Sequence, residues 1–341
     1  MKTERFDFKL PDELIAQAPS NKRDQSRLMV CDPVKNSIQD KKFHDITELL
    51  DEQSVLVLNN TKVINARLKG TKKTGAAIEV FLLEELETNS WKCLVKPTKR
   101  INEGDIIEFT TQLKGEIIKK GRFCKIKFLA EKNVIDFINE VGEPPLPPYI
   151  KCSNPKQFEE RYQTVFAKNV GSVAAPTAGL HFTDELIAKL QYKGVQIEYV
   201  TLHVGYGTFK GIETTTIDEH QMHKEMYYID QDVADRLNKF KKDGKNIISV
   251  GTTSARTLES AAENNIIKAG SGSSTLFIKP GYSFQFIDAL ITNFHLPKSS
   301  LFVLVSTIAG VEFMSKAYKE AIKNKYRFYS FGDAMFITRR Q

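Results

Sequence analysis

Five segments of the sequence place polar or small side chains where a predicted strand ends or a predicted helix begins. They are residues 171–183, 201–209, 220–225, 250–260 and 291–297. α/β proteins bind ligands at such positions, beyond the carboxyl ends of their strands. Four of the segments contain histidine, whose imidazole exchanges protons near neutral pH. The pattern therefore predicts acid and base chemistry on a bound ligand.

Two of the segments are rich in glycine and other small residues. Residues 171–183 lead into a helix predicted to start after Thr183, so the backbone can approach a ligand and the helix N-terminus can favour an anion. A tightly packed loop is the alternative. Residues 201–209 contain Gly205 and Gly207 beside aromatic residues able to stack on a flat ring. These glycines lack the third glycine and the immediate helix of a dinucleotide-binding fingerprint.

The segment from His220 to Glu225 allows several interpretations. Two histidines three residues apart, His220 and His223, can meet one metal ion on a helix, but no His-Glu-x-x-His pattern is completed. We therefore predict no metal site. Proton transfer, hydrogen bonding to a substrate and an ordinary structural role stay open for both histidines.

Residues 250–260 follow a predicted buried strand and open a helix with Thr252, Thr253 and Arg256 near its start. Free N–H groups at a helix N-terminus, together with an arginine fork, can hold a carboxylate or a phosphate. The Gly-Lys-Ser/Thr of a P-loop is missing, which argues against nucleoside triphosphate hydrolysis. In the last segment, Asn293 and His295 are harder to explain by packing than the neighbouring Phe294.

Alternating strands and helices must position these segments. We predict strands over residues 54–58, 195–204, 246–250 and 286–292, and helices over residues 184–193, 232–242, 255–263, 300–309 and 312–324. This alternation is typical of an α/β domain with a parallel or mixed sheet. Residues 65–128 differ, because short and evenly spaced strand patterns broken by tight turns predict a small β-barrel.

A proline-rich stretch marks where the barrel ends. Residues 144–148 contain four prolines, which predict a stiff extended connector. Because residues 54–58 precede the barrel and resemble a buried strand of the α/β domain, we predict that the barrel is an insertion. The predicted organisation is a discontinuous catalytic α/β domain, residues 1–62 and 149–341, and an inserted basic β-barrel domain with its exit linker, residues 63–148.

Composition narrows the class of protein. A chain of 341 residues, with 41% hydrophobic and 27% charged residues, is long enough for two folded domains and is not disordered. It has no apolar run of membrane-spanning length, no signal peptide pattern and four widely spaced cysteines, so we expect a cytoplasmic protein with reduced thiols.

The chain carries a net charge of +7, and residues 65–128 contain 14 Lys and Arg against 8 Asp and Glu. This local excess suits a polyanion such as nucleic acid. A lysine-rich solvated surface is the alternative.

Together, these segments closely resemble the S-adenosylmethionine:tRNA ribosyltransferase-isomerases of queuosine biosynthesis. The similarity runs through nearly the whole chain, and so many linked motifs are very specific. The motifs are FDFKLPDELIAQAPSNKRDQSR (6–27), LNNTKVINARLK (58–69), PLPPYI (145–150), RYQTVFAKNVGSVAAPTAGLHFT (161–183), TLHVGYGTF (201–209), HQMHKE (220–225), GTTSARTLES (251–260), PGYSF (280–284), LITNFHLPKSSL (290–301) and YRFYSFGDAM (326–335).

The resemblance implies a reaction. The ribosyl group of S-adenosylmethionine moves to the aminomethyl group of a 7-deazaguanine at the tRNA wobble position and is rearranged, giving epoxyqueuosine, adenine and methionine. The resemblance also implies an α/β domain with an inserted small β-barrel, S-adenosylmethionine as co-substrate, no metal, no membrane and a cytoplasmic monomer.

Such a reaction needs a base for the carbon beside the sulfonium, an acid for the departing adenine, and removal of a proton from the substrate amine. Matching the motifs, the catalytic candidates are His181, His203, His220, His223, His295 and Asp333, with base and acid unassigned among the histidines. The candidates for binding S-adenosylmethionine are Pro176, Thr177, Gly179, Phe182, Gly205, Gly207, Thr208, Phe209, Thr252, Thr253, Arg256 and Asn293.

Some of these candidates have a specific expected role. We expect Phe182 and Phe209 to stack on adenine. Thr252, Thr253 and Arg256 are expected to hold the methionine carboxylate. The basic barrel is expected to grip the tRNA backbone while the wobble base enters the pocket.

Two other functions compete with this interpretation. An S-adenosylmethionine-dependent RNA methyltransferase would also combine a sulfonium substrate with a basic accessory domain, but it would release S-adenosylhomocysteine. An RNA-binding protein without activity leaves five histidines at element ends unexplained.

Overall fold

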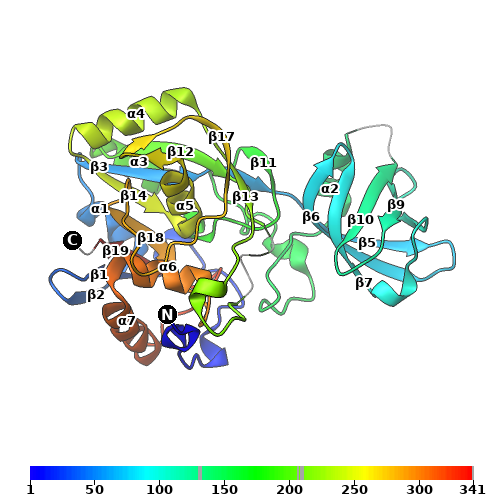
Figure 1. Cartoon of the computed structure of the whole chain (residues 1–341), viewed down its shortest axis with the longest axis horizontal. Helices are drawn as coiled ribbons and strands as arrows, with labels where there is room; N and C mark the ends of the chain where they lie inside the picture. Colours follow the sequence, from blue (N-terminus) through cyan, green and yellow to red (C-terminus); the bar gives the residue numbers. More distant parts are fainter. Residues whose placement is uncertain (130–132, 206, 208–210, 340–341) are drawn as a thin grey trace.

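The computed structural model describes residues 1–129, 133–205, 207 and 211–339, and its main body is a mixed β-sheet with helices on both faces (Figure 1). In these residues the sheet has nine strands in the order β17-β13-β12-β3-β14-β18-β19-β1-β2. The strands are β1 (Arg27–Asp32), β2 (Ser37–Lys42), β3 (Ser54–Asn59), β12 (Gln196–Leu202), β13 (Glu225–Ile229), β14 (Asn246–Val250), β17 (Gly270–Ser274), β18 (Ala289–Asn293) and β19 (Ala334–Thr338).

Four neighbouring strands of this sheet, β12, β3, β14 and β18, run parallel. Their carboxyl ends therefore lie at one edge of the sheet, which is where α/β folds bind ligands. All four were predicted from the sequence, although β18 begins three residues later than predicted. The predicted segments 171–183, 201–209, 250–260 and 291–297 continue from, or lie beside, this edge.

Helices cover both faces of the sheet. They are α1 (Ile46–Leu49), α3 (Asp184–Tyr192), α4 (Gln231–Lys242), α5 (Gly251–Ala261), α6 (Ser300–Ala309) and α7 (Val311–Lys323). The hydroxyl of Thr183 accepts a hydrogen bond from the Leu186 amide at 3.1 Å, so α3 has the predicted N-cap. By contrast, α5 begins at Gly251, four residues before its predicted start. Gly251 has φ +88°, which allows the chain to turn from β14 directly into the helix.

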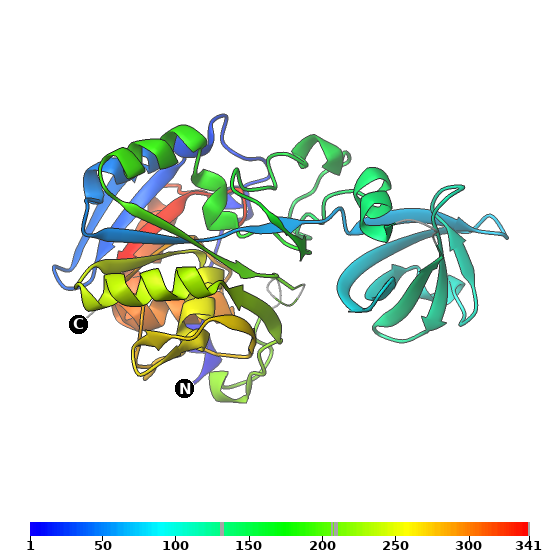
Figure 2. The ribbon, with the colours of Figure 1, turned by 90° about the horizontal axis from the view of Figure 1, so that it is seen from above.

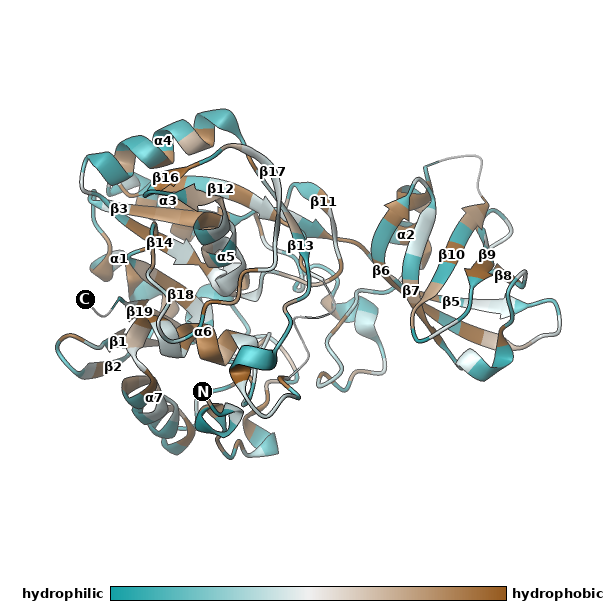
Figure 3. Cartoon of the chain, in the orientation of Figure 1, coloured by the Kyte–Doolittle hydropathy of each residue, from teal (hydrophilic) through white to brown (hydrophobic). Residues whose placement is uncertain are grey.

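The buried strand β3 divides the core of the sheet in two. Val55 and Val57 pack in the cluster that α4–α7 cover, whereas Leu56 and Leu58 pack in the cluster beneath α1 and α3. This alternation follows from the two-residue period of a strand. Figure 3 shows β3 hydrophobic along most of its length and α4 mostly hydrophilic, as expected for a central strand and a surface helix.

Six antiparallel strands close into a barrel that stands to one side of the α/β body (Figures 1 and 2). They are β5 (Arg67–Lys72), β6 (Ala77–Glu87), β7 (Ser90–Lys96), β8 (Ile106–Glu108), β9 (Lys114–Lys119) and β10 (Cys124–Leu129), in the order β10-β7-β6-β5-β8-β9. The following helix α2 (Val134–Val141) buries Val134 and Ile138 in the barrel core. The predicted fold class, α/β with a mixed sheet and a small β-barrel, is confirmed.

The two connections between the barrel and the body run side by side. The backbones of Arg67, at the entrance to the barrel, and Glu143, at its exit, exchange two hydrogen bonds of 3.2 and 2.8 Å. Closer to the body, the short strands β4 (Thr61–Val63) and β11 (Asn169–Ser172) pair in parallel. These contacts join the barrel connections to the edge of the sheet where the predicted site lies.

No single helix among the described residues is long and apolar enough to cross a membrane. α6 and α7 meet the length and composition of a span only as a pair, which is bent by 114°.

Candidate active site

A narrow cavity of about 60 Å³ opens at the carboxyl ends of β14 and β18. Its walls come from the first turn of α5, from residues 292–296, from residues 174–178, and from Tyr149, Tyr329 and Ser330. Val204 also lines it, so the cavity gathers parts of four predicted segments. The predicted site residues that line it are Pro176, Thr177, Thr252, Thr253, Asn293 and His295.

The N-terminus of α5 faces this cavity without a side-chain cap. No described side chain accepts a hydrogen bond at its N-cap, Val250. The hydroxyl of Thr253 is buried and has no partner among the described residues. The neighbouring helix α6 differs, because Ser299 caps it by accepting a hydrogen bond from the Phe302 amide at 3.1 Å. The first turn of α5 thus presents amide donors and a hydroxyl to a ligand anion.

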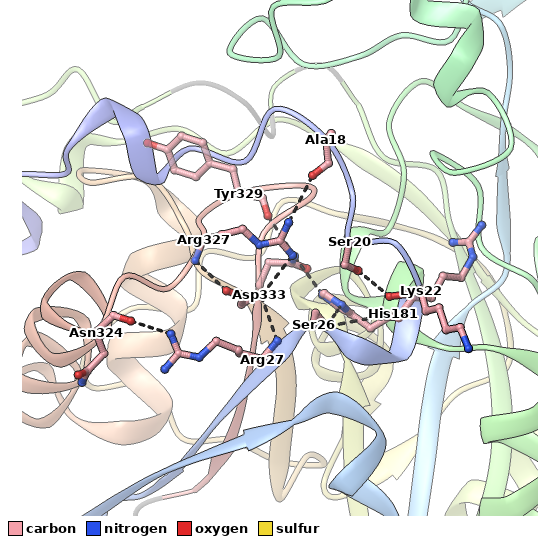
Figure 4. Close-up of polar contacts among 12 residues, drawn as sticks. Ala18, Ser20, Lys22, Ser26, Arg27, His181, Asn324, Arg327, Tyr329 and Asp333 are labelled. Carbon is pink, nitrogen blue, oxygen red and sulfur yellow. Dashed lines mark hydrogen bonds and ion pairs between the residues drawn. The ribbon is translucent and has the colours of Figure 1, made fainter.

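Asn293 also lines the cavity and is 2% exposed. Its Nδ2 donates to the Tyr329 carbonyl oxygen at 3.1 Å and lies 3.2 Å from Nε2 of His181. Its Oδ1 is buried and has no partner among the described residues. The other ring nitrogen of His181, Nδ1, lies 2.7 Å from Oγ of Ser26 (Figure 4). Burial lowers the pKa of His181 to about 4, so the ring is neutral near pH 7.

His295 is the histidine that lines the cavity directly. Its Nε2 lies 2.9 Å from the Thr292 hydroxyl, and its backbone N–H donates to the Tyr318 hydroxyl at 2.9 Å. The residue is 8% exposed, and burial lowers its pKa to about 3. His295 is therefore a neutral group held in a fixed orientation at the cavity wall.

His203 lies beyond the end of β12 and points toward the barrel connections. Its Nδ1 is 2.8 Å from Oγ1 of Thr61 in β4, and a Cβ atom on Gly171 of β11 would come within 3.0 Å of its ring. Thr61 also donates to the Asn169 carbonyl oxygen at 3.4 Å. Burial lowers the pKa of His203. Its immediate neighbour Val204, but not His203, lines the cavity.

His220 and His223 lie on the segment that leads into β13. The His220 ring packs edge-on against Phe277 with a centroid distance of 5.4 Å, and burial together with His223 lowers the pKa of His220. The His223 ring lies against Gly207, where a Cβ atom would approach it to 2.2 Å. Across the described residues, no three His, Cys, Asp or Glu side chains form a group able to hold a metal ion.

Arg256 does not reach the cavity that it was expected to serve. Its guanidinium forms an ion pair with Glu225, and its Nε donates to the Leu276 carbonyl oxygen at 3.2 Å. Both charged residues are 5% exposed. Glu225 also accepts a hydrogen bond from the Gly205 amide at 3.1 Å. The pair therefore connects α5 to the segment after β12. In this structure Arg256 binds the Glu225 carboxylate, whereas it was expected to bind the carboxylate of methionine.

Two other predicted ligand-binding residues lie in the core. Phe182 is fully buried and packs edge-on against Phe43 at 5.1 Å, so no purine can stack on it in this structure. Gly179 packs closely against Phe166, because a Cβ atom added to Gly179 would lie 2.8 Å from the Phe166 ring. Thr208 and Phe209 lie outside the described residues.

Asp333 is a buried carboxylate whose oxygens are bound by the protein itself. It accepts hydrogen bonds from the amides of Arg27 and Arg327, at 3.0 and 2.8 Å, and from the Arg327 guanidinium at 3.3 Å (Figure 4). It is 2% exposed and does not line the cavity. The structure therefore places Asp333 where it joins β1 to the loop that carries Tyr329, away from the position expected for a group that contacts substrate.

Two tyrosines that sequence reasoning did not select form one side of the cavity. The rings of Tyr149 and Tyr329 lie 4.7 Å apart at an angle of 50°, and the Tyr149 hydroxyl is 2.7 Å from Oγ of Ser330. Tyr329 has φ +73°, an uncommon conformation for a bulky residue. The available sequence signals were their motifs, PLPPYI and YRFYSFGDAM, but only the fold shows that these meet.

Comparison with known proteins identifies the family. A family profile described as "Queuosine biosynthesis protein" matches residues 3–337. The chain belongs to this family. It is also similar to the crystal structure of an S-adenosylmethionine tRNA ribosyltransferase from Thermotoga maritima, with 38% sequence identity, coverage of 98% of this chain and 99% of that chain, and a TM-score of 0.57. The predicted family is thereby confirmed.

Proposed function

We propose that this queuosine biosynthesis protein transfers the ribosyl group of S-adenosylmethionine to 7-aminomethyl-7-deazaguanine in tRNA and isomerises it, releasing adenine and methionine. The family match and the 38% identical ribosyltransferase bear out the predicted enzyme class. The observation that supports this proposal best is the cavity at the strand ends, which is lined by both the uncapped start of α5 and Asn293, whose Oδ1 has no partner among the described residues.

The groups around the cavity match the chemical groups of S-adenosylmethionine. The amides of the first turn of α5 and the hydroxyl of Thr253 suit the methionine carboxylate, because they combine the positive end of the helix dipole with a free donor. Tyr149 and Tyr329 offer aromatic surface for the purine. When bound, S-adenosylmethionine supplies the ribosyl group and a sulfonium that acidifies the adjacent carbon.

The hydrogen bonds of the histidines suggest different roles in proton transfer. Because the Thr61 hydroxyl donates its hydrogen to the Asn169 carbonyl oxygen, it accepts a hydrogen bond from Nδ1–H of His203. Nε2 of His203 then carries the ring's free lone pair and can take a proton. His295 touches the cavity itself. We therefore assign His203 and His295 as the first candidates for proton transfer, with His220 and His223 as further candidates.

The barrel, within residues 63–148, is the part proposed to hold the tRNA backbone. Among its described residues, six basic side chains form ion pairs with acids: Arg67, Lys69, Lys72, Lys92, Lys114 and Lys125. Among the described residues, Lys119, Lys120 and Arg122 form no ion pair and are exposed at the β9–β10 turn. Uncompensated charges of this kind are available to phosphates.

We also propose that the protein acts as a monomer. The proposed substrate also implies a cytoplasmic protein, because the modified base must be reached in tRNA.

The test is to incubate the purified protein with S-adenosylmethionine and tRNA that carries the precursor base. Mass spectrometry should detect adenine, methionine and epoxyqueuosine in the tRNA. Formation of S-adenosylhomocysteine would instead indicate methyl transfer. Binding of tRNA without any turnover would leave only the RNA-binding alternative.

A further inference from the structure

The orientation of the Asn293 amide is determined by its neighbours. The carbonyl oxygen of Tyr329 can only accept, so the atom of Asn293 that lies 3.1 Å from it must be the nitrogen. The same nitrogen faces Nε2 of His181 at 3.2 Å. Oδ1 is therefore the other amide atom, which is buried and has no partner among the described residues, on a residue that lines the cavity. A buried acceptor of this kind is costly unless a ligand supplies a donor.

His181 and Ser26 hold this orientation in place. Because Asn293 donates to Nε2 of His181, the ring proton lies on Nδ1 and is donated to Oγ of Ser26 at 2.7 Å. The Ser26 hydroxyl can then donate to the Arg23 carbonyl oxygen, 3.5 Å away. The His181 ring is stacked on Phe43 with a centroid distance of 4.9 Å, which prevents it from turning. Both nitrogens of His181 are thus engaged, and neither is available to a substrate.

The neighbours of Asn293 indicate which donor Oδ1 receives. Asn293 is bonded to the backbone of Tyr329, and Tyr329 and Tyr149 supply the aromatic side of the same cavity. The proposed anion site at Thr253 belongs to a different element, the first turn of α5. A planar ring beside the tyrosines, with an exocyclic amine at its edge, satisfies both the aromatic surface and the unpartnered acceptor.

We propose that Asn293 accepts a hydrogen bond from the exocyclic 6-amine of the adenine ring, and that His181 and Ser26 are positioning residues that fix Asn293 for this purpose. This rests on the proposed function, since the adenine belongs to S-adenosylmethionine. The cavity then distinguishes a 6-aminopurine from a 6-oxopurine, whose carbonyl oxygen would face Oδ1 with no hydrogen between them.

The experiment uses two unreactive probes, S-adenosylhomocysteine and S-inosylhomocysteine, which differ at this one position. By titration calorimetry, we expect the wild-type protein to bind the adenosyl compound about 10- to 100-fold more tightly, as is typical when a buried acceptor is left unpaired. In Asn293→Ala the ratio of the two affinities should fall to about threefold or less. The matched control Thr253→Val should weaken the binding of both probes and keep the ratio of their affinities.

Several outcomes would overturn the proposal. Equal binding of the two probes by the wild-type protein would do so, as would a ratio that survives Asn293→Ala. If Asn293→Ala instead weakened the binding of free methionine and kept the ratio of the probe affinities, Oδ1 would accept from the methionine ammonium. Failure of both probes to bind would show that the cavity is not the S-adenosylmethionine site. Release of adenine from S-adenosylmethionine by the same preparation tests the proposed function separately.

The positioning role of His181 has its own readout. His181→Gln should raise KM for S-adenosylmethionine about tenfold or more, reduce the probe ratio, and leave the shape of the pH–rate profile unchanged. Ser26→Ala should produce a smaller change in the same direction, and Ser26→Thr should restore binding. The charged groups around His181 are Asp333, Arg327 and Arg23, and all stay in place in these variants. Loss of one limb of the pH–rate profile in His181→Gln would show that His181 transfers a proton and would overturn its positioning role.

Discussion

The hydroxyl of Thr61 lies 2.8 Å from Nδ1 of His203, although the two residues are 142 positions apart in the sequence. Thr61 is the first residue of β4, directly after the chain leaves β3 for the barrel. Asn59, the last residue of β3, binds the residue before His203, because its side chain exchanges hydrogen bonds of 2.9 and 3.1 Å with the backbone of Leu202. The entrance to the barrel therefore also orients a candidate catalytic base.

This contact predicts that Thr61→Val lowers activity while Thr61→Ser preserves most of it. Valine removes the oxygen that selects the His203 tautomer, whereas serine retains it. We expect a fall of about 10- to 100-fold in the single-turnover rate of adenine release, since general base catalysis contributes about 100-fold or more. Equal rates for Thr61→Val and the wild-type protein would contradict a catalytic role for His203.

The buried Arg256–Glu225 pair predicts a large effect on stability. Arg256→Met leaves the Glu225 carboxylate without its arginine in the interior, which should reduce the free energy of unfolding by about 3–5 kcal/mol. The double variant Arg256→Met with Glu225→Gln should recover part of this loss. Urea unfolding measures both. If Arg256 held the methionine carboxylate instead, Arg256→Met would abolish product inhibition by methionine with little change in stability.

The exposed basic residues at the β9–β10 turn predict salt-dependent tRNA binding. Replacing Lys119, Lys120 and Arg122 with Gln should weaken tRNA affinity by about tenfold or more and reduce the slope of log K against log salt, because fewer counterions are released. The control, Lys239→Gln with Lys242→Gln on α4 of the α/β body, should leave both quantities nearly unchanged. Filter binding at several salt concentrations measures them, and equal losses in the two variants would contradict specific contact by the barrel.

The buried histidines predict that acid destabilises the fold. Folding lowers the pKa of His181 to about 4 and of His295 to about 3 from an ordinary value near 6.5, because burial disfavours the charged ring. The unfolded chain therefore binds more protons than the folded one between about pH 6.5 and 4 because of His181, and between about pH 6.5 and 3 because of His295. Stability is fully present above pH 6.5 and falls as the pH drops through these windows. In urea titrations, His181→Gln with His295→Gln should flatten the decline, and an unchanged decline would exclude these two rings as its cause.

Much of the architecture follows from local sequence patterns. The continuous apolar run of β3, the N-cap at Thr183, and the short strands between tight turns are short-range signals, and they predicted a central strand, α3 and the barrel. Five strands of the described sheet, β1, β2, β13, β17 and β19, were not predicted. The edge strand β2 is half exposed and strongly polar, and β17 is composed of Gly and Ser, so neither has the apolar alternation of a typical strand.

The amino-acid sequence by itself determined the family, the α/β fold with its barrel, and the candidate residues that the structure brings to one edge of the sheet. Only the tertiary structure decided what each of these residues touches. It paired Arg256 with Glu225, buried Phe182 in the core, joined His181 to Asn293, and brought Tyr149 beside Tyr329. The physical reason is that hydrogen bonds and burial depend on partners far apart in the chain, and residue type and spacing do not record those distances.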